Sequence, residues 1–262
     1  MKKILVIGCS HSQGAYDKND NVVNNESWCY HLSKIRNKKE KYFVISCPGL
    51  GILHYGAILY YLQQENLLKN FDTCIIQLTH ELRLMIYNEK IDEYYEFVTK
   101  WIKNILKSKS KFNILPFNDI ILGQNRVISY ISGETYKLHE KNFKNTESKN
   151  QWLSVVERIH TGTNTKLVNT IYPIYYSYIK NIAQKNNLEL IVFDWWGKKI
   201  NNLLDNIKGT EWILDSLMEE AKEKNQWDLR SISKVGQHHN SKSSHKMAVI
   251  INEKINEYKK LQ

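Results

Sequence analysis

Residues 4–14 read ILVIGCSHSQG, and this stretch decides the fold class. It opens with four consecutive aliphatic side chains, the pattern of a parallel strand that is covered on both faces. Gly8 and Gly14 enclose a polar turn, so we expect the chain to leave the strand sharply. A side chain in such a turn is held rigidly, and Ser10 is the candidate for chemistry there.

The order of strand, polar turn and helix recurs along the chain. Strands are predicted over residues 41–46, 72–78 and 188–193. Amphipathic helices are predicted over residues 28–35, 55–62, 91–106 and 168–182, the last with a kink or a new start at Pro173. Such alternation requires right-handed crossovers and a parallel sheet with helices on both faces. We therefore predict a three-layer α/β/α, flavodoxin-like fold with a central parallel sheet.

Two regions are less regular. Residues 108–164 contain short apolar pieces separated by Gly, Asn and Lys, which predicts an insertion that either pairs as strands or covers the active face as a lid. Trp212, Leu214 and Leu217 predict a short helix. A chain of 262 residues is long enough for one large core and does not require two, so we expect residues 1–262 to form a single domain.

Composition restricts the classes of partner. The net charge is +10, but the basic residues are scattered among Asn, Ser and Glu, so we expect a solvated surface and no nucleic-acid partner. The apolar run that follows Lys2 and Lys3 has four residues, whereas a signal peptide needs about 7–15. No stretch is apolar enough to span a membrane. These features predict a soluble, cytoplasmic protein.

The cysteines Cys9, Cys29, Cys47 and Cys74 all lie in the first third of the chain. Their spacing fits no metal site, and a domain of this size does not depend on disulfides. We therefore expect buried thiols and neither a metal nor another cofactor.

A second polar stretch lies near the other end of the chain, where residues 236–245 read GQHHNSKSSH. A final helix is predicted after it, because Met247, Ala248, Ile251, Ile255 and Tyr258 share one face. The carboxyl ends of parallel strands meet at one edge, and a helix packed on the sheet brings its preceding loop there. Ser10 and His239 are therefore predicted to meet as nucleophile and base.

These residues resemble the blocks of the SGNH, or GDSL-type, hydrolases. The tripeptide Gly8-Cys9-Ser10 is similar to the first block, usually Gly-Asp-Ser, whose serine is the nucleophile. Gly49 matches the glycine of the second block, whose backbone N–H donates to the oxyanion. His239, with His245 six positions later, matches the last block, usually written D-x-x-H-P-N-x-x-G-H. The resemblance implies an ester hydrolase that works through an acyl-Ser10 intermediate, with the Ser10 and Gly49 amides in the oxyanion hole.

Cys9 and Asn240 stand where the family usually has Asp and Pro, and the sequence departs from the family at two other places. The third block normally supplies an Asn to the oxyanion hole, and here Thr79 or Gln77 would have to replace it. Gly236 stands where the acid of the triad is expected. Asp228 and Asp194 remain candidate acids, and a Ser–His dyad without an acid is the other possibility.

Several alternatives stay open at this point. Cys9 is another candidate nucleophile and His238 another candidate base, while we expect His245 to pack against or cap the last helix. The first-choice substrate is an O-acetylated carbohydrate, because the resemblance often implies deacetylation and because Trp and Tyr suit a wet cleft. A lipid or a thioester is the alternative substrate. The alternatives are an O-acyltransferase on the same scaffold, or a catalytically silent module that binds glycan or protein.

Overall fold

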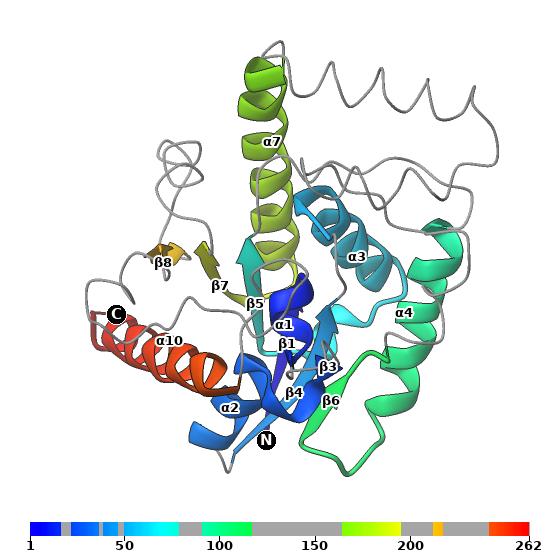
Figure 1. The fold of residues 1–262 in the computed structure, drawn as a ribbon. Helices are drawn as coiled ribbons and strands as arrows, with labels where there is room; N and C mark the ends of the chain where they lie inside the picture. The colour runs from blue at the N-terminus through cyan, green and yellow to red at the C-terminus, as the bar shows by residue number, and fades with distance from the viewer. Residues whose placement is uncertain are drawn as a thin grey trace, which may run out of the picture.

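The structure is a computed structural model, and it describes residues 1–16, 22–36, 39–46, 50–78, 91–116, 164–194, 212–216 and 241–261. These residues contain a six-stranded, all-parallel sheet in the order β6-β4-β1-β5-β7-β8 (Figure 1). The strands are β1 (Lys2–Gly8), β4 (Glu40–Ser46), β5 (Thr73–Leu78), β6 (Phe112–Ile114), β7 (Glu189–Asp194) and β8 (Trp212–Ser216). Without β6, which extends the edge at β4, this is the strand order of flavodoxin-like sheets. The predicted three-layer fold is confirmed.

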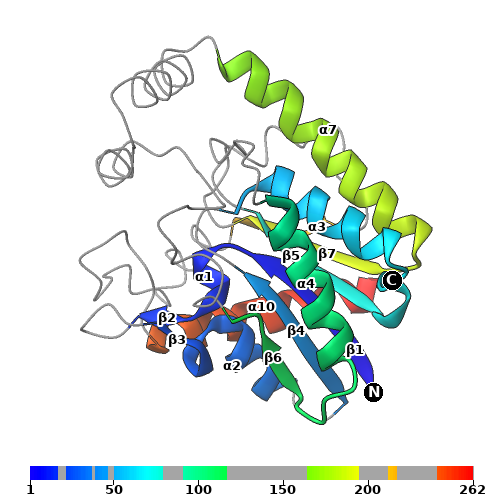
Figure 2. The same ribbon diagram turned by 90° about the vertical axis from the view of Figure 1, so that its right-hand side faces the viewer.

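Helices cover both faces of the sheet (Figures 1 and 2). One face carries α3 (Ile52–Gln64), α4 (Ile91–Ile105) and α7 (Asn164–Lys185), and the other carries α2 (Trp28–Ile35) and α10 (Ser241–Leu261). In β1, Leu5 and Ile7 pack toward the first group of helices, whereas Ile4 and Val6 pack toward the second. Because both faces of β1 are buried, its aliphatic run is unbroken.

Short elements follow the first strand. They are α1 (Ser10–Gln13), a hairpin of β2 (Ala15–Tyr16) and β3 (Val22–Val23), and the 3-10 turn η1 (Asn24–Glu26). A further 3-10 turn, η2 (Leu68–Asn70), precedes β5.

The structure differs from the sequence predictions at several elements. Helix α10 begins at Ser241, inside the polar stretch 236–245 that was predicted to precede it. Trp212 and Leu214 lie in a strand rather than a helix, because β8 pairs in parallel with β7 and α10 packs beside it. Helix α7 continues through Pro173 as one helix, held in the core by Tyr172 and Tyr176. The expected insertion begins with β6, which pairs with β4, and residues 117–163 of it lie outside the described residues.

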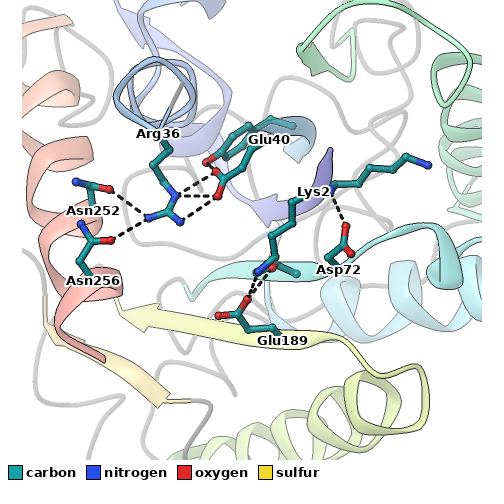
Figure 3. Close-up of polar contacts among 10 residues, drawn as sticks. Lys2, Arg36, Glu40, Asp72, Glu189, Asn252 and Asn256 are labelled. Carbon is teal, nitrogen blue, oxygen red and sulfur yellow. Dashed lines mark hydrogen bonds and ion pairs between the residues drawn. The ribbon is translucent and has the colours of Figure 1, made fainter. Parts of the chain in front are cut away.

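Polar side chains near the amino ends of the strands form a network of hydrogen bonds and ion pairs (Figure 3). The Arg36 guanidinium donates to both oxygens of Glu40 at 3.0–3.2 Å, and its Nη1 donates to Asn252 at 3.2 Å and Asn256 at 3.4 Å. The Tyr42 hydroxyl donates to Glu40 Oε2 at 2.6 Å. The network joins the end of α2 and the start of β4 to the C-terminal half of α10.

We expect Glu40→Ala to lower the free energy of unfolding by about 2–3 kcal/mol, because it leaves the Arg36 guanidinium without its counter-ion. The side chains of Arg36 and Glu40 are only 15% and 11% exposed. Glu96→Ala is the matched control: it removes an i,i+4 pair with Lys100 whose side chains are 64% and 72% exposed. That loss should stay below about 0.5 kcal/mol. Urea unfolding at pH 7 measures both variants, and equal losses would contradict the expectation.

Candidate active site

The carboxyl ends of the central strands lie together at one edge of the sheet. Strands β1 and β5 are neighbours, aligned by the pairing of Ile7 with Ile76, and β7 is aligned with β5 by the pairing of Asp194 with Leu78. From β1 the chain continues to β4 on one side, and from β4 it crosses back to β5 on the other side of β1, so the direction of the connections reverses between β1 and β5. Open α/β sheets bind their ligands at such a topological switch point. The loops after β1 and β5 are therefore the place to look for a site.

Helix α1 places the backbone of Ser10 at this point. Ser10 is the first residue of α1 and follows the last residue of β1 by two positions. Cys9 caps the helix in an extended conformation, with φ of −97° and ψ of −161°. The Ser12 N–H donates to the Cys9 carbonyl at 2.9 Å and closes the turn. The strand thus passes into α1 without an intervening loop.

A buried polar cluster holds α1 from behind. The Ser12 hydroxyl donates to Gln77 Oε1 in β5, and Ser12 Oγ accepts from Trp28 Nε1 at 3.2 Å. The Cys29 thiol donates to the Ser12 carbonyl at 3.4 Å. The Trp28 ring in turn packs edge-on against Phe193 of β7, with 5.2 Å between ring centroids. Because Ser12 and Gln77 are fully buried, these contacts are shielded from water.

This cluster explains why residue 8 is a glycine. A Cβ on Gly8 would overlap Ser12 Oγ and lie 2.7 Å from Ser12 Cβ and 2.9 Å from Gln77 Oε1. The space that a side chain would fill is occupied by the hydrogen bond between Ser12 and Gln77. The first glycine of the opening motif therefore has a steric role.

Further buried polar atoms lie at the same edge. Gln77 Nε2, Gln13 Oε1 and Ser46 Oγ have no hydrogen-bond partner among the described residues. They come from β5, α1 and the end of β4, which are the elements that surround the switch point. Buried polar atoms normally find partners, so these three atoms make the surroundings of the switch point polar.

His54 is a buried histidine in the first turn of α3. Its Nδ1 accepts a hydrogen bond from the Gly51 N–H at 3.2 Å, which assigns the proton of the neutral ring to Nε2. Burial lowers the pKa of His54 to about 4. The side chain is therefore neutral at pH 7 and caps the start of α3.

The stability of the protein should fall as His54 is protonated. Its pKa is about 4 in the folded state and near 6.5 when unfolded, so its contribution is complete above pH 6.5 and is lost as the pH falls toward 4. We expect the free energy of unfolding to decrease by about 3 kcal/mol more in the wild type than in His54→Gln between pH 7 and pH 4. Glutamine still offers an oxygen to the Gly51 N–H but does not titrate. Urea unfolding across this range measures the difference, and parallel pH profiles would contradict it.

A pair of histidines joins α2 to α10. The rings of His31 and His245 meet edge-on, with 5.1 Å between centroids. Burial and the neighbouring His245 both lower the pKa of His31. His245 lies in the second turn of α10, so it packs against a neighbouring helix, in line with its expected role.

The described cysteines are buried free thiols. Cys9, Cys29 and Cys74 are fully buried. Burial raises the pKa of Cys74 to about 12 and raises that of Cys29 well above its ordinary value. A buried thiol does not meet substrate, which disfavours Cys9 as the nucleophile.

Most of the other predicted site residues lie outside the part of the chain that the structure describes. These are Gly49, Thr79, Asp228, Gly236, His238 and His239. Asp194 is the last residue of β7, so its backbone lies at the same end of the sheet as that of Ser10. Figure 2 shows α1, the β2–β3 hairpin and the first turns of α10 at this end of the sheet. Helix α10 begins at Ser241, two residues after His239.

Ser12 and Gln77 were not predicted to act together. They are 65 positions apart, and no local pattern links them. The available signal was Gln77 itself, a long polar side chain inside an apolar strand. Such a residue requires a buried partner, but the sequence does not reveal which one.

A separate apolar groove of about 430 Å³ lies between α3 and α7. It is lined by Leu53, Ala57, Tyr60, Ile174, Tyr175 and Tyr178. The two helices approach closely here because Gly56 has no side chain: a Cβ would meet the rings of Tyr175 and Tyr178 at 3.3 and 3.4 Å. The groove belongs to the α3–α7 helix layer, whereas Ser12 and Gln77 lie on the α2–α10 face of the sheet.

The described residues were also compared with the requirements of a membrane span and of a metal site. None of their helices has the length and apolarity needed to cross a membrane. Among the same residues, no three His, Cys, Asp or Glu side chains are grouped so that they could hold a metal ion.

No protein-family model matches the sequence, and no curated protein matches it. Among solved structures, a putative arylesterase from Agrobacterium tumefaciens str. C58 is 11% identical, with 98% of this chain and 100% of that chain covered and a TM-score of 0.35. A second crystal structure is 12% identical, with 98% of each chain covered and a TM-score of 0.38. Likeness at this level carries no argument about function.

Proposed function

We propose that this protein is a serine ester hydrolase in which Ser10 is the nucleophile and His239 the base. The observation that carries the proposal is the position of Ser10 on α1, directly after β1 and at the switch point of the sheet. The start of α10 at the same edge, two residues after His239, supports the pairing. The resemblance of both segments to SGNH blocks supplies the roles.

The proposed reaction proceeds through an acyl-enzyme. His239 takes the proton of the Ser10 hydroxyl while the oxygen attacks the ester carbonyl carbon. The Ser10 and Gly49 amides, with Thr79 as a third donor, stabilise the oxyanion. Collapse breaks the C–O bond to the alcohol, which leaves with the proton from His239. Water, activated by His239, then attacks the acyl carbon, releases the acid and restores Ser10.

Two features of the proposed site determine the catalytic rate that we expect. Asp194 and Asp228 are the candidates to orient His239, and neither stands at the usual position of the triad acid. Each oxyanion donor is worth about 10²–10³ in rate, so a site without the usual Asn should be slower than a complete one. We expect a modest esterase with an intact fold.

An O-acetylated carbohydrate is the proposed substrate, because the resemblance to SGNH hydrolases often implies deacetylation. Trp28 and at least six of the tyrosines are buried in the core, and Tyr and Trp side chains outside it would suit sugar rings. The test is to incubate the protein with an O-acetylated oligosaccharide and an unacetylated acceptor, and to measure free acetate and acetylated acceptor by mass spectrometry. We expect free acetate from the wild type and none from Ser10→Ala. Acetylated acceptor without free acetate would replace the hydrolase by an acyltransferase. Neither product, together with no turnover of p-nitrophenyl acetate, would overturn the proposal in favour of a binding module.

A further inference from the structure

The hydrogen bond between Ser12 and Gln77 spans the switch point of the sheet. Ser12 is on α1, two residues after Ser10, and Gln77 is the penultimate residue of β5. The bond therefore ties the element that carries Ser10 to β5, the strand next to β1. Both side chains are fully buried.

We propose that Ser12 and Gln77 are positioning residues that hold α1, and with it Ser10, in the orientation needed for attack on an ester. The inference rests on the proposed function of Ser10. Helix α1 has only four residues, so it has too few internal hydrogen bonds to hold itself in place. Its orientation must come from contacts with the rest of the fold.

Those contacts converge on Ser12. Its hydroxyl donates to Gln77, its Oγ accepts from Trp28 at 3.2 Å, and its carbonyl accepts from the Cys29 thiol at 3.4 Å. Its N–H closes the turn on Cys9 at 2.9 Å. One residue thus links α1 to β5 and α2, and a loss of this link would let Ser10 move.

The geometry of Gly8 agrees with the importance of this bond. The absence of a side chain at residue 8 leaves the space that Ser12 Oγ and Gln77 Oε1 occupy. A glycine weakens a buried strand. The space that the bond between Ser12 and Gln77 requires explains why residue 8 is nevertheless a glycine.

The test compares Ser12→Ala, Gln77→Met and the double variant in the full chain. Ser33→Ala is the matched control, because the Ser33 hydroxyl donates to the Tyr30 carbonyl at 2.6 Å within α2. The readouts are kcat and KM for p-nitrophenyl acetate, the rate of labelling by a fluorophosphonate, and amide hydrogen exchange of residues 9–14. If Gln77→Met does not fold, Ser12→Ala decides, because it removes one oxygen and adds no bulk.

We expect each single variant to lower kcat and the labelling rate about 10–100-fold, with KM within about twofold of the wild type. The double variant should lose no more activity than the more damaging of the two single variants, because both single changes break the bond between Ser12 and Gln77. Ser33→Ala should stay within about twofold of the wild type. Unchanged kcat in folded variants, or losses that multiply in the double variant, would overturn the inference.

The two proposals fail in different ways. If the wild type neither hydrolyses p-nitrophenyl acetate nor reacts with the fluorophosphonate, the proposed function is wrong. Amide hydrogen exchange then decides whether Ser12 and Gln77 hold α1. Faster exchange confined to residues 9–14 in both single variants would sustain that part of the inference, and unchanged exchange would overturn it.

Discussion

Ser10→Ala is expected to lower kcat/KM for p-nitrophenyl acetate by about 10³-fold or more, because it removes the oxygen that forms the acyl-enzyme. His239→Ala should cause a loss of similar size, since the hydroxyl is a weak nucleophile without its base. The double variant should be no slower than either single variant, because nucleophile and base act as one unit. Initial rates at pH 7.5 with purified proteins measure all three.

Two controls separate this result from general damage. His238→Ala changes the adjacent histidine, and we expect it to retain activity within about threefold, since a single imidazole serves as base. Unfolding curves should show that Ser10→Ala and His239→Ala keep the wild-type fold. A larger loss in His238→Ala than in His239→Ala would reassign the base, and full activity in Ser10→Ala would remove the nucleophile.

Gly8→Ala is expected to lower the free energy of unfolding by about 3 kcal/mol, the upper part of the range for overpacking in a core. The new Cβ would overlap Ser12 Oγ and lie 2.7 Å from Ser12 Cβ, so α1 itself must move to admit it. The strain is steric, and it falls on the helix that carries Ser10. We therefore also expect a loss of esterase activity in whatever fraction folds.

Gly56→Ala is the matched control for this variant. Its Cβ would meet only ring carbons of Tyr175 and Tyr178, at 3.3 and 3.4 Å, which small ring movements relieve. Alanine also favours the interior of α3 by about 1 kcal/mol over glycine. Its unfolding free energy should stay within about 1 kcal/mol of the wild type. Comparable losses for Gly8→Ala and Gly56→Ala in urea unfolding would contradict the steric argument.

The sequence predicted most of the sheet because its strands are continuous apolar runs. The runs in β1, β4, β5 and β7 are unambiguous, since burial on both faces leaves few polar residues in them, of which Gln77 is one. The long helices α4 and α10 were equally clear from their 3.6-residue period. Strand β8 was missed because a run of five residues that contains Trp212 and Leu214 fits a strand as well as a short helix. Its pairing with β7 makes it a strand, and the local sequence does not encode that pairing.

The candidate site was only partly predictable. A polar turn after a buried strand identifies Ser10, and the histidine loop before a C-terminal helix identifies His239, because the fold class brings such segments to one edge. The bond between Ser12 and Gln77 depends on how β1 and β5 align, which involves contacts between distant segments. Buried partners of this kind become visible only in the folded structure.

The most direct test of the central claim is to identify the residue that a fluorophosphonate labels. The folded protein is treated with the probe, digested and analysed by mass spectrometry, with His239→Ala as a parallel sample. We predict one adduct, on Ser10, formed at least about 100-fold more slowly in His239→Ala. An adduct on another residue, or no adduct on a wild type that hydrolyses esters, would contradict the assignment of Ser10 as the nucleophile.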